Sequence, residues 1–317
     1  MPCPRPWSPL IALLLACLLA AGAAAGEITY RSVPSATLGA PIPYALYRPD
    51  GVAPDRRLPV LYLLHGLGDD ERAWPTLGHI GPTLDALIAE GALPPLLVVM
   101  PAAGRTWYVD GVEGQPRYNT AFFKDFMPAV ERSLSALSCR EARATAGLSM
   151  GGYGALLFAF QRSDLFGAAI SLSGSIFQPA PADPAERAKR QTRMFGDVFG
   201  TPFDWRAFQT WNLFPRIADF TALADPPALY LAVGDKDFPG LIRGNELFQA
   251  ALAAAGVRVT LHVDPGSHTW PLWTAQIGPA LAWLGQRLAT GCRSGTECTS
   301  TTGGKEDRSG ITALKLC

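Results

Sequence analysis

The chain has little charge, and the charge that it has is balanced. Of its 317 residues, 27 are basic and 27 are acidic, so the formal net charge is zero. This balance gives no electrostatic reason to expect a nucleic acid or another polyanion as a partner. The CxxC and HExxH spacings are both absent from the sequence, so no metal site is expected. The 32 glycines and 28 prolines follow no period, which excludes collagen-like and solenoid architectures.

General disorder is excluded as well, because 48% of the residues are apolar and 10% are aromatic. A folded chain of this length buries roughly 75% of the surface that its unfolded form exposes, so its core needs neither a metal nor a disulfide. The composition therefore predicts a soluble α/β protein of the size of an enzyme.

Residues 1–25 are expected to be a secretory signal peptide. Arg5 gives a positive n-region, residues 10–20 form an apolar h-region, and residues 23–25 offer a small-residue cleavage site. The apolar core is shorter than the roughly 20 residues that a spanning helix needs, so no stable membrane insertion is expected after cleavage. The location is therefore predicted to be secreted or periplasmic, with lipid anchoring at Cys17, in a faint lipobox, as the alternative.

Cleavage would leave a domain at residues 26–290 and a loosely ordered tail at residues 291–317. Export permits disulfides, and the remaining cysteines allow three pairings that the sequence does not separate. These cysteines are Cys139, Cys292, Cys298 and Cys317.

Strand and helix patterns alternate along the domain after an opening β-meander, which predicts a mostly parallel sheet with helices on both faces. Strands are expected at residues 28–33, 42–47, 58–64, 96–100, 143–146, 168–172, 229–233 and 257–263. Helices are expected at residues 82–91, 121–137, 152–162, 241–255 and 272–288. The aromatic-rich insertion at 175–227 interrupts this order, and we interpret it as a helical subcore, as the roof of an apolar substrate pocket, or as both.

The segment 147–151, which reads GLSMG, matches the G-x-S-x-G pattern. It follows a predicted strand and leads into a long apolar helix, which is the strand–turn–helix setting of a nucleophile elbow. Side chains in place of Gly147 or Gly151 would crowd the neighbouring strand and helix. Ser149 is therefore the predicted nucleophile.

His268 is expected to be the base among the four histidines of the chain. A serine hydroxyl becomes a good nucleophile when a neighbouring base takes its proton, and the base of an elbow serine follows the last strand. His268 lies in that loop. By contrast, His262 lies within the predicted strand, His79 sits in a glycine-rich loop, and His65 is expected to brace a turn.

The acid that orients the histidine should follow the preceding strand, where GDKD at 234–237 offers two carboxylates. Asp237 is favoured, because it stands further past the strand end and can turn back toward the imidazole. Asp235 is expected to cap the loop or the following helix, and Asp264 is a third candidate. The carboxylate would hold the imidazole tautomer and stabilise the imidazolium.

The oxyanion of a tetrahedral intermediate needs two fixed donors. They are predicted to be the backbone N–H groups of Met150, directly after the serine, and of Leu67, in the loop that reads HGLG at 65–68.

Six segments, spread over roughly residues 28–289, resemble the esterase D-like α/β-hydrolases. They are LYLLHGLGDD (61–70), TWYVDG (106–111), GLSMGGYGAL (147–156), SLSG (171–174), GDKD (234–237) and GSHTWPLW (266–273). That family groups S-formylglutathione hydrolases, feruloyl and related carboxylesterases, and the antigen 85 mycolyltransferases. The resemblance implies an α/β-hydrolase fold and the same five site residues: Ser149, Asp237, His268, Leu67 and Met150.

Together these features predict an exported serine carboxylesterase that hydrolyses a small-molecule ester through an acyl-enzyme and requires no cofactor. The alternatives are an acyltransferase that moves an acyl chain to a sugar or lipid hydroxyl, a thioesterase like the S-formylglutathione hydrolases, and a non-catalytic binding protein. The thioesterase is less favoured, because those enzymes are typically cytosolic and their elbow reads GHSMGG, whereas this chain has Leu148 and an export signal. The acyl chain, the alcohol and the oligomeric state are left open.

Overall fold

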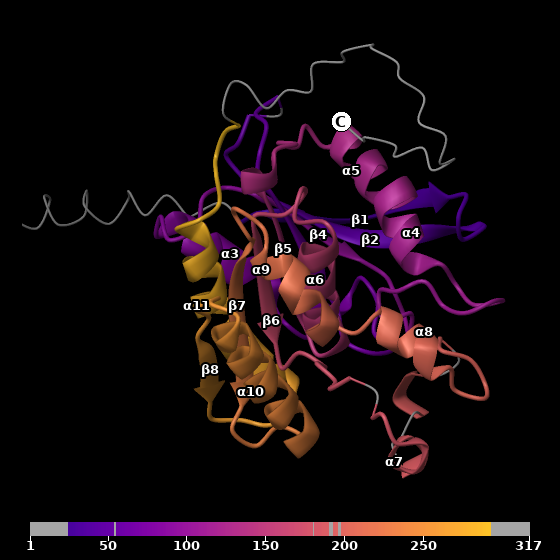
Figure 1. The fold of residues 1–317 in the computed structure, drawn as a ribbon. Coiled ribbons are helices and arrows are strands. Elements are labelled where there is room, and N and C mark those ends of the chain that lie inside the picture. The colour runs from indigo at the N-terminus through magenta and orange to yellow at the C-terminus, as the bar shows by residue number, and fades with distance from the viewer. Residues whose placement is uncertain (1–24, 54, 180, 190–192, 196–197, 293–317) are drawn as a thin grey trace, which may run out of the picture.

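The computed structural model describes residues 25–53, 55–179, 181–189, 193–195 and 198–292 (Figure 1). Nearly all of the expected signal peptide, with the alternative lipid site at Cys17, lies outside the described residues. So does most of the expected tail, with Cys298 and Cys317. In the part of the chain that is described, no helix has the length and apolar character needed to cross a bilayer.

An eight-stranded sheet in the order β1-β2-β4-β3-β5-β6-β7-β8 forms the centre of the fold. Its strands are β1 (Glu27–Ser35), β2 (Ala40–Arg48), β3 (Val60–Leu64), β4 (Leu97–Pro101), β5 (Arg143–Leu148), β6 (Ala168–Leu172), β7 (Ala228–Gly234) and β8 (Leu261–Asp264). The β1–β2 and β2–β4 pairs are antiparallel and the other five pairs are parallel. The mostly parallel sheet is confirmed.

Two details of the predicted strands are wrong. The first three strands do not form a meander, because β4 lies between β2 and β3. The last strand is shorter than the predicted 257–263, since residues 257–260 make no ladder with β7 and pairing begins at Leu261.

The helices cover both faces of the sheet (Figure 1). They are α2 (Ala73–Thr76), α3 (Ile80–Ala89), α4 (Tyr118–Ala121), α5 (Met127–Ser133), α6 (Met150–Gln161), α7 (Pro184–Lys189), α8 (Trp205–Thr210), α9 (Ile217–Thr221), α10 (Pro239–Ala254) and α11 (Trp270–Gly285). Buried side chains of α3 and α11 form one apolar core, and those of α4, α5, α6 and α10 form the other. The helix predicted at 121–137 is instead α4, a π-helical turn at Phe122–Phe126 and α5.

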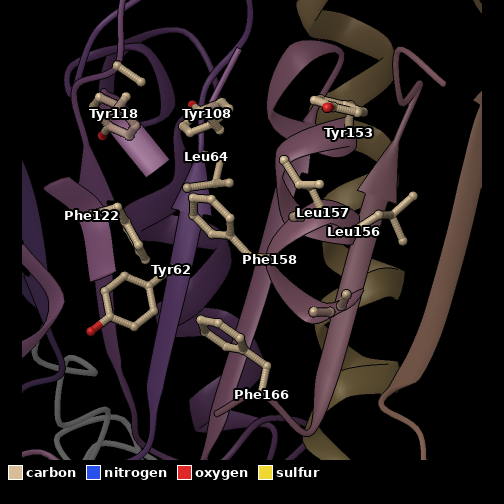
Figure 2. Close-up of a cluster of buried hydrophobic side chains, with 14 of the residues drawn as sticks. Tyr62, Leu64, Tyr108, Tyr118, Phe122, Tyr153, Leu156, Leu157, Phe158 and Phe166 are labelled. Carbon is tan, nitrogen blue, oxygen red and sulfur yellow. The ribbon is translucent and has the colours of Figure 1, made fainter. Parts of the chain in front are cut away.

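The larger core contains aromatic rings packed between β3 and the helical segments that cover this face of the sheet (Figure 2). The rings of Tyr62 and Phe122 meet edge to face with centroids 5.3 Å apart, and Phe122 lies 4.4 Å from Phe158 of α6. The Tyr62 hydroxyl donates to Glu131, 3.0 Å away, which satisfies the polar tip of a fully buried side chain. This packing fixes α6 against the sheet, and α6 begins directly after Ser149.

A disulfide joins Cys139 to Cys292, with the two Cα atoms 5.7 Å apart. Of the pairings that the sequence left open, the structure thus shows one bridge. It spans 153 residues and ties the segment before β5 to the segment after α11.

The insertion at 175–227 forms short helices that pack on the larger core. Its rings form a continuous aromatic cluster in which Phe195 contacts Phe199, Phe203 and Phe208 at centroid distances of 5.3–5.7 Å. The cluster continues into the main domain, because Phe195 also lies 4.7 Å from Trp107. The interpretation of the insertion as a helical subcore is therefore confirmed.

Candidate active site

Ser149 occupies a sharp turn between β5 and α6. Its backbone has φ 53° and ψ −117°, a conformation that is strained for a residue with a Cβ. The turn is too tight for side chains at its two glycines. A Cβ on Gly151 would lie 2.5 Å from the carbonyl oxygen of Leu64, and a Cβ on Gly147 would overlap the Gly151 carbonyl. The turn thus holds Ser149 at the carboxyl end of the sheet.

The Ser149 hydroxyl is hydrogen-bonded to an imidazole that comes from much later in the chain. His268 Nε2 lies 2.9 Å from Ser149 Oγ, and His268 Nδ1 lies 2.8 Å from Asp237 Oδ1. Ser149 follows β5, Asp237 follows β7 and His268 follows β8. Parallel strands end at the same edge of a sheet, which brings the three residues together. Because an ionised carboxylate only accepts, Nδ1 carries the proton and Nε2 is left to accept from the hydroxyl.

The Asp237 carboxylate is buried and held by hydrogen bonds. The residue is 4% exposed, whereas the His268 side chain keeps 15% of its surface. Burial alone would raise the pKa of Asp237, but hydrogen bonds from His268 and the Phe238 N–H, together with the nearby Ser173 hydroxyl, bring that pKa below its ordinary value. The carboxylate therefore stays ionised beside the imidazole, where it can stabilise a positive charge.

The other two candidate acids bind elsewhere. Asp235 Oδ1 accepts from the Gly266 N–H at 2.8 Å, so this side chain ties the loop after β7 to the loop that carries His268. Of the two roles predicted for it, this is the loop role, since α10 begins after Phe238. Asp264 Oδ2 accepts from Gln276 at 2.8 Å. Among the described residues, neither carboxylate is hydrogen-bonded to His268.

The loop at 65–68 lies against the Ser149 turn. A Cβ on Gly66 would lie 2.8 Å from the Leu148 side chain and 3.9 Å from the Cβ of Ser149. The Leu67 N–H donates to no other residue that the structure describes. Met150 is the first residue of α6, where a backbone N–H has no intrahelical acceptor. Both predicted oxyanion donors are thus unused groups on segments that adjoin Ser149.

His65 braces this loop through its ring. The Ala103 N–H donates to Nε2 at 2.8 Å, so the proton is on Nδ1, which donates to the Gly66 carbonyl at 2.7 Å. The imidazole is 1% exposed, and burial lowers the pKa of His65 to about 4. A neutral ring with both nitrogens engaged holds the backbone of the loop in one conformation.

Two serines near the site were not singled out as candidates from the sequence. Ser175 Oγ lies 3.3 Å from Ser149 Oγ, and Ser173 Oγ accepts from the indole N–H of Trp273 at 3.1 Å. The Trp273 ring in turn meets the His268 ring edge to face, with centroids 4.9 Å apart. The segments SLSG and GSHTWPLW contain Ser173 and Trp273, but serine and tryptophan at those spacings match no elementary catalytic motif.

An exposed aromatic side chain lies over the imidazole. Phe238 is 62% exposed, and its ring centroid is 5.0 Å from that of His268. Phe238 directly follows Asp237, so the same loop presents the carboxylate and an exposed ring beside the imidazole.

A small aromatic cavity begins one helical turn beyond Ser149. Tyr153, whose N–H donates to the Ser149 carbonyl, is one of its walls. Ile176, Phe177 and Phe195 line it from the insertion, together with Trp107. Its volume is about 10 Å³, which is room for roughly one water molecule.

Comparison with known families gives a match over most of the chain. Residues 35–284 match the family model Esterase, described as "Putative esterase". A xylanase/feruloyl esterase of Xylanibacter ruminicola is 34% identical over 126 residues, 39% of this chain and 17% of that protein. An acetyl esterase of Caldicellulosiruptor saccharolyticus is 25% identical over 72% of this chain and 83% of its own length. Esterase Rv1288 of Mycobacterium tuberculosis is 34% identical over 71% of this chain and 50% of its own length.

Solved structures show the same architecture. A ferulic acid esterase superposes with a TM-score of 0.69 at 26% identity, covering 84% of this chain and 99% of its own. The S-formylglutathione hydrolase FrmB of Staphylococcus aureus has a TM-score of 0.62 at 22% identity, covering 82% of this chain and 98% of its own, which shows the fold alone. These matches confirm the predicted α/β-hydrolase fold and the resemblance to the esterase D-like proteins.

Proposed function

The chain belongs to the esterase family, and from that premise we propose that it is an exported carboxylesterase in which Ser149, His268 and Asp237 form the catalytic triad. One observation supports this assignment above the others. The hydroxyl, the imidazole and the carboxylate form a continuous hydrogen-bonded chain, with the hydroxyl on a strained turn at the sheet edge. The proposed substrate is a small-molecule ester.

In the proposed reaction, Ser149 Oγ attacks the ester carbonyl carbon as its proton passes to His268 Nε2. The imidazolium that results is stabilised by Asp237, which remains a carboxylate. His268 then gives the proton to the leaving alcohol, and the acyl group stays on Ser149. A water molecule, deprotonated by the same nitrogen, attacks the acyl-enzyme and releases the acid.

The negative charge that develops on the carbonyl oxygen needs two donors with fixed positions. We assign this role to the N–H groups of Leu67 and Met150, which are unused and adjoin the nucleophile. The hydrogen bonds of His65 hold the loop that contains Leu67, so the donor is in place before the substrate binds.

Export is supported by the disulfide between Cys139 and Cys292, because such bridges persist in oxidising compartments and are rare in the cytosol. It also fits the signal-peptide pattern of residues 1–25.

Covalent labelling tests the nucleophile directly. A p-nitrophenyl phosphonate should form one adduct with the wild-type chain, and peptide mass mapping should find it on Ser149. A label on another residue, or equal labelling of Ser149→Ala, would contradict the assignment. Product analysis with and without a sugar acceptor then separates hydrolysis from acyl transfer, since an acyl-sugar that outpaces free acid would identify a transferase.

A further inference from the structure

A second hollow lies at the β8 edge of the sheet, and none of the three proposed triad residues lines it. This cleft, between the last two strands and α11, has a volume of about 640 Å³. That size is typical of small-ligand sites. Figure 1 shows β8 as the outermost strand, with α11 beside it.

The side chains that line the cleft are set by the two-residue repeat of the strands and the 3.6-residue repeat of the helix. His262 pairs with Ala232, so Tyr230 and His262 present their side chains on the same face of β7 and β8. From α11 and the residue that caps its end, side chains three or four positions apart line the opposite wall, among them Gln276, Trp283 and Gln286. Since β8 is the edge strand, no further strand in the described chain closes the gap.

Aromatic rings form one part of the lining. The Tyr230 and His262 rings stack with centroids 4.4 Å apart and planes inclined by 13°. The Trp283 ring lies 5.4 Å from Tyr230 at an angle of 58°. Tyr230 is 7% exposed, whereas His262 and Trp283 keep part of their surface exposed, so these two rings give the cleft a flat apolar surface that can pack against the C–H face of a sugar ring.

Hydrogen-bond acceptors form the other part. Gln276 is 3% exposed, and its Nε2 donates to Asp264 Oδ2 at 2.8 Å, which orients the carboxylate. Among the described residues, Gln276 Oε1 has no hydrogen-bond partner and Asp264 Oδ1 accepts no hydrogen bond. A buried amide oxygen without a partner is costly, so this wall is suited to a ligand that brings several O–H donors.

The charges around the cleft restrict the ligand further. Among the described residues that line it, the charged one is Asp264, whose carboxylate repels an anion. A cation would meet Arg287, whose guanidinium lies 4.3 Å from the centre of the Trp283 ring. We propose that the cleft is a binding site for a neutral saccharide, which stacks on the aromatic rings and donates hydroxyl protons to Asp264 and Gln276. The proposal does not depend on the esterase activity.

Calorimetric titration of the full chain with xylotetraose, cellotetraose and maltotetraose tests the site. At least one should bind, and Trp283→Ala should weaken its binding by about tenfold or more, the loss expected for a stacked ring. Ala275→Trp, at an exposed position of the cleft wall, should fill the cleft and abolish binding without removing any packed side chain. Tyr30→Ala is the matched control, because it removes an exposed ring from the opposite edge of the sheet and should leave binding unchanged.

Two further measurements separate this site from the proposed active site. Chain labelled with phosphonate at Ser149 should bind the saccharide as tightly as unlabelled chain, and Ala275→Trp should hydrolyse p-nitrophenyl acetate at the wild-type rate. If Trp283→Ala does not fold, the loss of saccharide binding is measured in Ala275→Trp and Gln286→Ala instead. The proposal is overturned if none of the three saccharides binds at millimolar concentration, if Ala275→Trp binds like wild type, or if the phosphonate blocks binding. Self-association that Ala275→Trp abolishes, without saccharide binding, would overturn it in favour of a dimer interface.

Discussion

Asp237 and His268 are 31 positions apart in the sequence, and the oxygen Oδ1 of the first lies 2.8 Å from the nitrogen Nδ1 of the second. This contact determines which imidazole nitrogen carries the proton. It depends on two loops that are themselves joined, because the Gly266 N–H donates to Asp235 and the Lys236 N–H donates to the Gly266 carbonyl. The loop that presents the carboxylate therefore also positions the imidazole.

Asp237→Asn should reduce the kcat for p-nitrophenyl acetate by roughly 10⁴-fold, because an amide NH₂ next to Nδ1 favours the wrong imidazole tautomer. Asp235→Asn is the matched control. Its amide oxygen can still accept from the Gly266 N–H, so the loss should stay below about tenfold. Steady-state kinetics on both variants decides, and a larger loss at position 235 would reassign the acid.

Ser149→Ala should lower the turnover of short p-nitrophenyl esters by about 10⁴–10⁶-fold, the scale of triad deletions. His268→Gln should give a loss of similar size, since the two residues act as a unit. His262→Gln is the control for the histidine, because that ring stacks on Tyr230 and contacts none of the proposed triad residues. Retention of most activity in Ser149→Ala, with the fold intact by circular dichroism, would remove Ser149 from its role.

The three residues proposed as the triad could be selected from the sequence, whereas several details of the fold around them could not. Ser149, Asp237 and His268 could be selected because each follows a predicted strand, and parallel strand ends meet at one edge. The choice between Asp235 and Asp237 rested on distance past the strand alone, and in the structure Asp237 is the one beside the imidazole. Ser173 and Trp273 could not be found this way, because their effect depends on packing between β6 and α11.

The errors in the fold have physical causes. The order of β2, β4 and β3 depends on contacts between strands far apart in sequence, which local patterns do not contain. The π-helical turn at Phe122–Phe126 lies inside an apolar pattern that continues from α4 to α5, so the change of hydrogen bonding leaves no trace in the residue types. Residues 257–260 alternate like a strand, but the ladder with β7 begins only at the Leu231–Leu261 pair, although β7 itself begins at Ala228.

The buried imidazole of His65 predicts a loss of stability in mild acid. An unfolded chain protonates a histidine below about pH 6.5, whereas burial lowers the pKa of His65 in the fold to about 4. The unfolded state thus binds more protons between these values, so the free energy of unfolding should fall by roughly 3 kcal/mol as the pH drops from 6.5 to 4. The Asp237 carboxylate changes the free energy of unfolding in a lower pH range, because its lowered pKa affects stability only below about pH 4.

Urea unfolding, followed by tryptophan fluorescence at several pH values, measures this effect. His65→Gln keeps an acceptor for the Ala103 N–H and has no proton to gain, so its stability should change much less between pH 7 and pH 4.5. His79→Gln is the control and should retain the wild-type slope. Equal slopes in wild type and His65→Gln would show that His65 is not the source of the acid sensitivity.

The disulfide should contribute substantially to stability, because it closes a loop of 153 positions. Constraint of the unfolded chain by a loop of this length predicts a loss of about 2–5 kcal/mol for Cys139→Ser. A reducing agent should destabilise the wild-type chain by a similar amount and leave Cys139→Ser unchanged. If Cys298→Ser produces the same loss as Cys139→Ser, the observed pairing would be contradicted.

The aromatic cavity beyond Tyr153 predicts a preference for small acyl groups. Its volume of about 10 Å³ leaves no room for a long chain while Phe177 and Phe195 keep their positions. The wild-type enzyme should therefore show a higher kcat/KM for p-nitrophenyl acetate than for the octanoate. Phe177→Ala should open the cavity without moving the backbone, because the Asn212 side chain donates to the Phe177 carbonyl at 3.0 Å.

We expect Phe177→Ala to shift the ratio of kcat/KM for octanoate over acetate upward by about tenfold, as each buried methylene gains about 0.8 kcal/mol on leaving water. Phe203→Ala is the matched control. It truncates a ring of the same cluster, but Phe203 does not line the cavity. A shift confined to Phe177→Ala would identify the cavity as the acyl site. An equal shift in both variants, or none in either, would mean that the acyl chain binds elsewhere, with the exposed ring of Phe238 as the next position to mutate.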